Sequence, residues 1–160
     1  MTGSDGAGRR HLDHVSIAGL RRMAAEVLTD DAFAYFSTGA RDELTQRANA
    51  AAWGSWDIVP RVLAGRPEPD PRTTLLGSSV ANPVAVAPMS AQRLAHPDGE
   101  LATARAAAAA GSLMVVSTST TVSIEELVAE TGVTTWFQLY ALADRDATLR
   151  MARRAQSARA

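Results

Sequence analysis

The sequence predicts an α/β fold built on a parallel sheet, and two observations support this prediction. Three short apolar runs, at residues 84–87, 114–117 and 136–140, have the length and composition of buried strands. Between them lie two segments with helical character, at residues 97–110 and 123–130. Strands that alternate with helices in this way are joined by right-handed crossovers and lie parallel in one sheet.

The first apolar run and the helix after it have clear boundary residues. Prolines flank the run at residues 84–87, so we expect a short strand that is buried on both faces. In the helix at residues 97–110, Pro97 suits the first helical position, and the acids of the first turn suit the positive end of the helix dipole. Gly111 can end this helix in a left-handed conformation. We expect functional groups in the loop between strand and helix.

The first half of the chain predicts helices followed by an irregular covering segment. Residues 1–14 are rich in glycine, serine and charge, so we expect a disordered N-terminal arm. Residues 15–160 contain no linker or internal repeat and are expected to belong to one domain. The apolar spacing predicts helices over residues 15–28, 31–37 and 42–53, with Ser16 as an N-cap, and a brief strand at residues 73–76.

The second half continues the alternation of strands and helices. In the helix at residues 123–130, Ser123 and Glu126 have the spacing of a capping box. A further helix at residues 144–158 follows the last apolar run, and a fourth strand is expected where the sequence ends. The acids of these helix ends are interpreted as charges that complement the helix dipole.

Composition excludes several kinds of protein. The formal net charge is −1 and the hydrophobic content is 46%, so a globular protein is expected, without a basic stripe for nucleic acid or an anionic membrane. No apolar run approaches the roughly 18 residues of a membrane span, and a cytoplasmic location is the default expectation. There are no cysteines, all 16 basic residues are arginine, and the three histidines lack a metal-ligand spacing, so no metal site is expected.

A (β/α)₈ TIM barrel fits the sequence better than an open doubly wound sheet. A dinucleotide-binding sheet should show a glycine-rich fingerprint after its first strand, and no glycine follows residue 87 until Gly99. In a barrel the site forms at the carboxyl ends of the strands, where this sequence places its polar residues. Because a barrel takes about 250 residues, we expect an N-terminal helical segment and the first three βα units of a truncated barrel.

Four segments resemble one family closely. The sequences YFSTGARDELT at residues 35–45, the whole stretch at residues 84–111, SIEEL at residues 123–127 and WFQLY at residues 136–140 are similar to FMN-dependent α-hydroxy-acid oxidases and dehydrogenases. The resemblance covers residues 16–160. It implies FMN as cofactor, and oxidation of an (S)-2-hydroxy acid such as glycolate, lactate or mandelate to the 2-oxo acid. It also implies oxygen or another electron acceptor, and a homo-oligomer for the full-length form.

The resemblance implies a cofactor-binding role for five residues. Pro88, Met89 and Ser90 match the loop after the first barrel strand, whose backbone lies against the flavin in the family. Ser117 resembles a strand-end hydroxyl, and Gln138 an amide, that hydrogen-bond the flavin ring. An amide side chain can both donate and accept along such a ring edge. Ser90 stands where the family usually has alanine or glycine, which leaves the electron acceptor open.

Two tyrosines are implied in substrate binding, and one of them in catalysis. Tyr35 resembles the tyrosine whose hydroxyl meets the substrate carboxylate, and Tyr140 the one that contacts the hydroxyl-bearing carbon or its oxyanion. Because side chains alternate along a strand, we expect Gln138 and Tyr140 to point the same way into the barrel mouth. Ser119 stands where glycolate-oxidising members have a tryptophan, which implies a roomier pocket for bulky or aromatic hydroxy acids.

Three interpretations of the function remain open. In the first, the chain is the N-terminal portion of an FMN-dependent (S)-2-hydroxy-acid oxidase or dehydrogenase. These 160 residues are expected to be inactive alone, because in the family several functional groups lie later in the chain: the general-base histidine, the carboxylate-binding arginine, a lysine near the flavin and the phosphate-binding loops. The alternative is a non-catalytic, truncated flavin-barrel fragment or a weak binding module. A third reading, another FMN barrel such as a type 2 isopentenyl diphosphate isomerase, is disfavoured by the WFQLY segment together with Tyr35.

Overall fold

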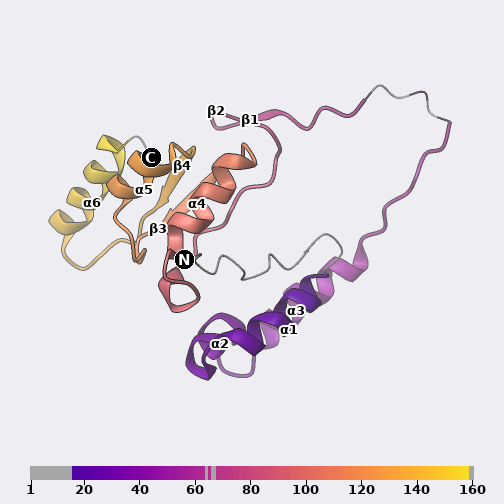
Figure 1. The fold of residues 1–160 in the computed structure, drawn as a ribbon, viewed down its shortest axis with the longest axis horizontal. Coiled ribbons are helices and arrows are strands. Elements are labelled where there is room, and N and C mark those ends of the chain that lie inside the picture. The colour runs from indigo at the N-terminus through magenta and orange to yellow at the C-terminus, as the bar shows by residue number, and fades with distance from the viewer. Residues whose placement is uncertain (1–15, 64, 66–67, 159–160) are drawn as a thin grey trace, which may run out of the picture. The chain divides into compact units, whose positions relative to one another are not determined.

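The computed structural model describes residues 16–63, 65 and 68–158, and the chain divides into two compact units (Figure 1). The first unit extends to Val59 and the second begins at Pro60. The arm expected at residues 1–14 lies outside the described residues. In the part of the chain that the structure describes, no helix has the length and apolar character needed to cross a bilayer.

In its described residues, 16–59, the first unit contains three helices and a short helical turn. These are α1 (Ile17–Val27), α2 (Asp30–Ser37), α3 (Leu44–Ala52) and η1 (Trp53–Ser55). As predicted, the Ser16 hydroxyl caps α1 by accepting a hydrogen bond from the Gly19 amide at 3.1 Å. Thr29 caps α2 in the same way. Helix α1 packs against α2, and the Arg21 guanidinium lies 5.8 Å from the Phe33 ring centroid.

The second unit contains a parallel pair of strands, β3 (Met114–Ser117) and β4 (Thr135–Gln138). They are joined through α5 (Ile124–Thr131), and β3 has the bounds that the sequence predicted. The register pairs each residue of β3 with one of β4 and ends with Ser117 opposite Gln138. The last residues of both strands therefore meet at one edge of the sheet.

The strand predicted at residues 84–87 is much shorter than expected, and its predicted burial is wrong. Only an isolated parallel bridge forms, between Val86 and Met114. The Val86 amide donates to Leu113 and the Val86 carbonyl accepts from Val115, at 2.8 and 2.9 Å. Val84 is exposed and Val86 half-buried, because among the described residues this segment has a strand neighbour on one side only. The bridge still places the segment next to β3, in parallel order.

A hairpin precedes this sheet. Strand β1 (Thr73–Leu75) pairs antiparallel with β2 (Ser78–Val80), and the sequence predicted only the first of them. Leu76 and Gly77 form the turn with φ values of 44° and 87°, which is the two-residue geometry that favours glycine. The indole N–H of Trp136 donates to the Ser78 hydroxyl at 3.2 Å and so connects the hairpin to β4.

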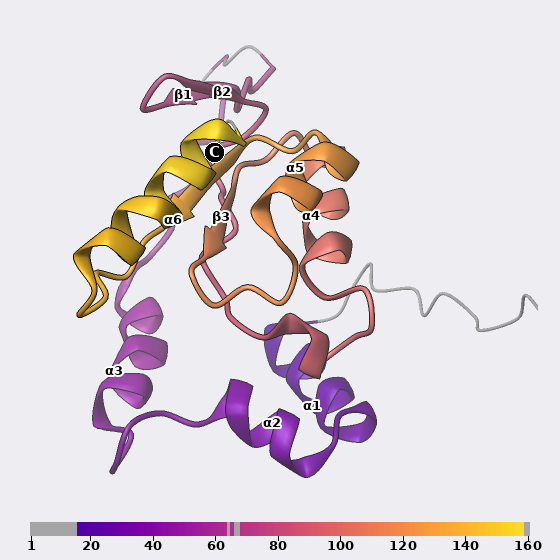
Figure 2. The same cartoon turned by 90° about the vertical axis from the view of Figure 1, so that its left-hand side faces the viewer.

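Three helices complete the second unit: α4 (Gly99–Ala109), α5 and α6 (Arg145–Ser157). Helix α4 packs against α5, as Figure 2 shows. Helix α5 also packs against α6. The predicted cap Ser123 accepts a hydrogen bond from a first-turn amide, and Asp144, where the last helix was predicted to start, caps α6 in the same way. The prediction that Pro97 opens α4 is wrong, because the turn through Pro97 ends in a left-handed Gly99 (φ 49°) and the helix begins there.

Gly111 ends α4 as predicted, with φ at 60°. Its amide donates to the Ala108 carbonyl and the Ser112 amide to the Ala107 carbonyl, which is the hydrogen-bond pattern of a Schellman motif. A side chain at position 111 would place its Cβ atom 2.6 Å from that of Ala81, so glycine is required by contact as well as by conformation.

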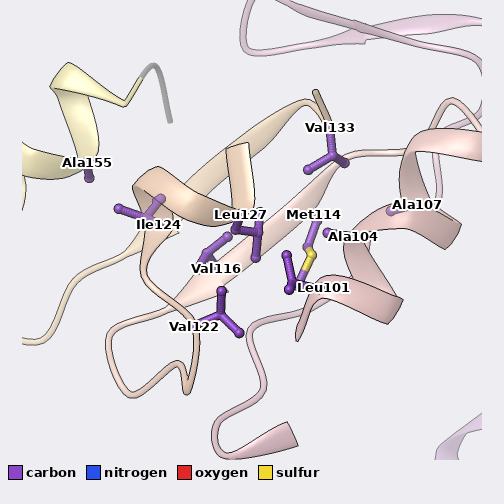
Figure 3. Packing of buried hydrophobic residues seen from close by; sticks show 10 residues of the cluster. All are labelled: Leu101, Ala104, Ala107, Met114, Val116, Val122, Ile124, Leu127, Val133 and Ala155. Atoms are coloured by element: carbon purple, nitrogen blue, oxygen red, sulfur yellow. The ribbon is translucent and has the colours of Figure 1, made fainter. Parts of the chain in front are cut away.

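The apolar core of the second unit lies between β3 and helices α4 and α5. Figure 3 shows Leu101 of α4, Met114 and Val116 of β3 and Leu127 of α5 gathered in one cluster. Leu127 and Val116 are completely buried. This core holds β3 against the helices that flank it, and so fixes the edge at which Ser117 lies.

Candidate functional site

The carboxyl end of β3 carries a buried hydroxyl group. Ser117 is the last residue of β3 and is 3% exposed. Its Oγ accepts a hydrogen bond from the Ser119 amide at 3.1 Å and lies 3.4 Å from the Oε1 of Gln138. The ladder register already places Ser117 opposite Gln138, so side-chain and backbone contacts both unite the two strand ends.

Ser90 reaches the same point from the loop after Val86. Its Oγ lies 3.0 Å from the Oγ of Ser117. A serine hydroxyl has one proton to donate. If Ser117 donates to Gln138, the hydrogen bond between the two serines must be donated by Ser90. The three side chains then form one chain of donors, from Ser90 through Ser117 to Gln138.

The Gln138 amide is held in one orientation. Its Oε1 accepts from the Thr118 backbone amide at 3.3 Å as well as from Ser117. Because a backbone amide can only donate, the oxygen must face Thr118 and the Nε2 group must face away. Among the described residues no hydrogen bond to this Nε2 group is formed, and Gln138 is half-buried. It is a fixed and available donor at the strand ends.

Thr118 connects the end of β3 to the residues that follow β4. Its hydroxyl donates to the Gln138 carbonyl and accepts from the Tyr140 amide at 3.0 Å. Strand β4 ends at Gln138, so the expected alternation of Gln138 and Tyr140 along one strand is wrong. Tyr140 lies beyond the strand and is 60% exposed. Thr118 therefore bridges the two strand ends, a role that its position after an apolar run does not reveal.

The loop after Val86 contains the other residues expected at the cofactor. Pro88 and Met89 are exposed, while Ser90 is half-buried. The Met89 carbonyl accepts a hydrogen bond of 3.5 Å from the side chain of Gln92, which is itself buried. The loop continues into a short helical turn, η2 (Gln92–Leu94). The backbone of the loop is therefore restrained by the buried Gln92 side chain.

Tyr35 belongs to the first unit, and its contacts are those within that unit. It lies in α2, is 52% exposed, and its ring meets that of Phe36 edge to face at 5.0 Å. The structure brings together Ser90, Ser117 and Gln138, and it brings the backbone of Tyr140 to Thr118.

Glu100 is buried, although its place in the first turn of α4 predicts an exposed charge that complements the helix dipole. It is only 1% exposed. Its carboxylate accepts hydrogen bonds from the Gln92 amide and from both the amide and the hydroxyl of Thr121. Burial raises the pKa of Glu100, but hydrogen bonds from Thr121, its own backbone and Gln92 outweigh this effect and lower the pKa.

A cavity of about 220 Å³ lies beside the strand ends. Its lining includes Thr118, Phe137 and Arg154, but none of Ser90, Ser117 or Gln138. The guanidinium of Arg154 is engaged in a two-pronged ion pair with Glu125, with contacts of 2.7 and 2.9 Å. The cavity thus lies between helices α5 and α6 and does not include the polar array, and Arg154, the charged residue of its lining, is already paired.

The polar array fits the edge of a flavin ring. A neutral isoalloxazine is flat and presents acceptors and donors along one edge, and Gln138 offers a fixed donor there beside the Ser117 hydroxyl. Pro88 and Met89 are exposed, so a flat ring can approach the loop there. In the described part of the chain, no group of three or more histidine, aspartate or glutamate residues is placed to hold a metal ion.

Comparison with known proteins identifies the family. The family model described as FMN-dependent dehydrogenase matches residues 24–160. The L-lactate oxidase of Alicycliphilus denitrificans is 39% identical over 137 residues, and human 2-hydroxyacid oxidase 1 is 40% identical over 144 residues. These alignments cover 86% and 89% of this chain, but only 38% and 39% of the relatives. The chain thus spans about two fifths of the length of these curated relatives.

Solved structures give the same result for the fold. A lactate oxidase of Pediococcus acidilactici superimposes with a TM-score of 0.84 at 37% identity, over 88% of this chain and 40% of that one. A mandelate oxidase with (S)-4-hydroxymandelic acid superimposes with a TM-score of 0.85 at 40% identity, over 91% and 41%. The predicted α/β barrel class and FMN as the family's cofactor are confirmed, although the described residues form no closed barrel. On this evidence the chain belongs to the family of FMN-dependent dehydrogenases.

Proposed function

We propose that these residues build one part of an FMN site in an enzyme that oxidises an (S)-2-hydroxy acid to the 2-oxo acid. The observation that carries the proposal is the array of Ser90, Ser117 and Gln138 at the strand ends, with the Gln138 Nε2 group left available. The names of the relatives, which are lactate, 2-hydroxyacid and mandelate oxidases, support the reaction class and oxygen as the acceptor. Bound FMN would supply the two-electron acceptor.

The side chains at the strand ends hold and orient the cofactor in this proposal. Gln138 hydrogen-bonds the ring edge through its Nε2 group, and Ser117 does so by turning its proton from Gln138 to the ring. The backbone of Pro88, Met89 and Ser90 lies against the ring. Each of these groups is neutral, so the site needs no additional buried charge to hold a neutral ring. The hydrogen bonds that these residues already make to one another keep them in place before the cofactor arrives.

The two tyrosines are proposed to bind the substrate. A phenol is a neutral donor, so the Tyr35 hydroxyl can hold a carboxylate without a second buried charge. Tyr140 contributes at the hydroxyl-bearing carbon, and Thr118 restrains its backbone through the hydrogen bond to the Tyr140 amide. Exposed Ser119 leaves room beside this point, which favours a bulky or aromatic 2-hydroxy acid. The likeness to a mandelate oxidase with (S)-4-hydroxymandelic acid is consistent with that choice.

We propose that these residues do not complete turnover by themselves. The general base of the proposed reaction should be a histidine near the substrate. His96, the histidine in the described part of the chain, lies on an exposed turn, where its Nδ1 accepts a hydrogen bond from the Asp98 amide at 3.2 Å. Its role there is to hold the turn before α4.

Titration of the 160-residue chain with FMN tests the flavin site. Flavin fluorescence anisotropy should report weak binding by the wild type. Gln138→Leu should weaken it about tenfold, the effect of one hydrogen bond near the upper end of its usual net value. Ser79→Ala, which changes an exposed serine of β2, is the matched control and should bind as the wild type does. Equal FMN affinity for Gln138→Leu and wild type would contradict the proposed site.

A second measurement separates the enzyme from a non-catalytic binding module. Glycolate, lactate and mandelate are added without oxygen to the FMN-loaded chain and, in parallel, to an active relative whose corresponding segment is replaced by residues 16–158. We expect the yellow absorbance to bleach in the chimera, because its flavin is reduced, and to persist in the FMN-loaded 160-residue chain. A chimera that binds FMN but is not reduced by any of the three acids would favour a binding module.

A further inference from the structure

Glu100 has an environment that a helix-end charge does not need. Its side chain is 1% exposed, and both carboxylate oxygens are used. Oε1 accepts from the Gln92 amide at 3.2 Å and from the Thr121 amide at 3.0 Å, and Oε2 accepts from the Thr121 hydroxyl. No ion pair with Glu100 forms among the described residues, so neutral N–H and O–H donors alone satisfy its charge. Burying a carboxylate costs free energy unless such donors surround it.

The neighbouring helix provides a useful comparison. Glu126 occupies the first turn of α5, where it can complement the helix dipole, and its side chain is exposed. Glu100 occupies the first turn of α4 but is directed inward, to two loops instead of to solvent. The dipole explains an acid at either position. It does not explain why one of the two is buried.

The two residues that donate to Glu100 belong to the two loops that carry the candidate site. Gln92 follows Ser90 by two residues in the loop after Val86, and Thr121 lies in the loop after β3, which begins beyond Ser117. The loops touch at one further point, where the Ala91 amide donates to the Ser119 carbonyl at 3.3 Å, and the first loop also meets the end of β3, where the Ser90 and Ser117 hydroxyls lie 3.0 Å apart. Buried Glu100 accepts hydrogen bonds from both loops.

The loop conformation itself depends on a restraint of this kind. Ala91 has a φ of 56°, in the left-handed region that costs a non-glycine residue about 1 kcal/mol or more. The Gln92 amide directly after it donates to Glu100, and the Gln92 side chain accepts from the Thr103 hydroxyl at 2.6 Å. The turn is thus held from α4 through two side chains. Release of the Gln92 amide would free Ala91 to return to an ordinary φ and move Ser90.

We propose that Glu100 is a positioning residue, whose buried carboxylate joins the loop after Val86 to the loop after β3 and thereby sets the spacing of Ser90 and Ser117. This role rests on the proposed flavin site for its functional meaning, but the spacing itself exists without flavin. Glutamine is a weaker substitute, because it keeps an acceptor for the two backbone amides but lacks the charge that strengthens these hydrogen bonds, and its Nε2 group would require the Thr121 hydroxyl to accept instead of donate. Aspartate is one methylene shorter and would not reach both loops from α4.

Disulfide formation measures the spacing directly. The natural chain has no cysteine, so the double variant Ser90→Cys/Ser117→Cys carries two thiols at the positions whose hydroxyls are 3.0 Å apart. Under a mild oxidant we expect the disulfide to form readily in this background. Adding Glu100→Gln should slow its formation about tenfold or more, since a hydrogen-bonded charge is lost from both loops. Adding Glu126→Gln instead is the control and should leave the rate unchanged.

Amide hydrogen exchange separates positioning from general stabilisation. In Glu100→Gln, the amides of Ala91, Gln92 and Thr121 should exchange about tenfold faster or more, while the β3 and β4 amides keep their wild-type rates. The proposal would be overturned if the exchange rates of loop and strand amides rose equally, or if neither the loop exchange rates nor the rate of disulfide formation changed. If Glu100→Gln does not fold, Thr121→Val removes one hydrogen-bond donor to Glu100, and the same two outcomes decide the proposal. Neither measurement contains flavin, so a wild type that fails to bind FMN would refute the proposed function and leave this result standing.

Discussion

The hydroxyl oxygens of Ser90 and Ser117 lie 3.0 Å apart, although 27 positions separate the two residues in the sequence. Ser117 is fixed by the β3–β4 register, and Ser90 by a loop that is bonded to α4. Two independent elements therefore converge on one point at the strand ends. Disturbing either element should change the site in a way that can be measured.

Ser117→Ala should destabilise the second unit by about 1–3 kcal/mol, because the Ser119 amide and the Ser90 hydroxyl lose a buried partner. Urea unfolding followed by Trp136 fluorescence measures this, in a background with Trp53→Phe and Trp56→Phe that leaves one tryptophan. Ser79→Ala, at an exposed position, should change the free energy of unfolding by less than about 0.5 kcal/mol. Equal effects of the two variants would show that the strand-end hydroxyl contributes no stability.

Gly111→Ala and Gly132→Ala separate backbone strain from steric contact. Both glycines have a φ of 60°, so each substitution should cost roughly 1–2 kcal/mol from conformation alone. The new methyl group at position 111 would also lie 2.6 Å from the Ala81 Cβ, whereas nothing lies within 4 Å at position 132. We therefore expect Gly111→Ala to be more destabilising by a further 1–3 kcal/mol or so. Identical unfolding midpoints would refute the close contact between Gly111 and Ala81.

The stability that Glu100 contributes should depend on pH. Its pKa is lowered in the folded protein from an ordinary value of 4.5, so the folded state favours the charged form. The contribution is fully present above pH 4.5 and is lost as the pH falls through the lower, folded-state pKa. The difference in free energy of unfolding between wild type and Glu100→Gln should be constant from neutral pH to about 5 and shrink in more acidic solution. A difference that grows on acidification would contradict a lowered pKa.

In an active enzyme that carries these residues, Tyr140→Phe should mainly affect the chemical step and Tyr35→Phe should mainly affect substrate binding. If Tyr140 contacts the reacting centre, its loss should lower kcat at least about tenfold, with a smaller effect on KM. If Tyr35 holds the carboxylate in ground state and transition state alike, its loss should raise KM and leave kcat nearly unchanged. Steady-state kinetics with mandelate measure both variants. An unchanged kcat for Tyr140→Phe would remove Tyr140 from the chemistry.

Predictions from the sequence succeeded where neighbours along the chain decide the structure. Ser16, Ser123 and Asp144 were predictable as helix starts, because a cap bonds to an amide two or three residues away. Gly111 was predictable as a helix end for the same reason. Strand β3 is a compact apolar run between a helix end and a polar loop, and its bounds were confirmed.

Predictions failed where partners are distant in the sequence. The apolar composition of residues 84–87 predicted a buried strand, but pairing requires neighbours, and only Val86 forms a bridge. Alternation along a strand placed Tyr140 with Gln138, but β4 ends where the Thr118 hydroxyl bonds to the Gln138 carbonyl and the Tyr140 amide. Neither bond leaves a signal in the local sequence pattern.

The sequence by itself determined the order of strands and helices, the caps that begin the helices, the family to which the chain belongs and the polar residues at the strand ends. Only the tertiary structure decided that Ser90, Ser117 and Gln138 share one hydrogen-bonded array, and that Glu100 is a buried link between two loops. The physical reason is that a cap or a turn is satisfied by atoms a few residues away. The environment of a carboxylate depends on which loops the packed core brings to it.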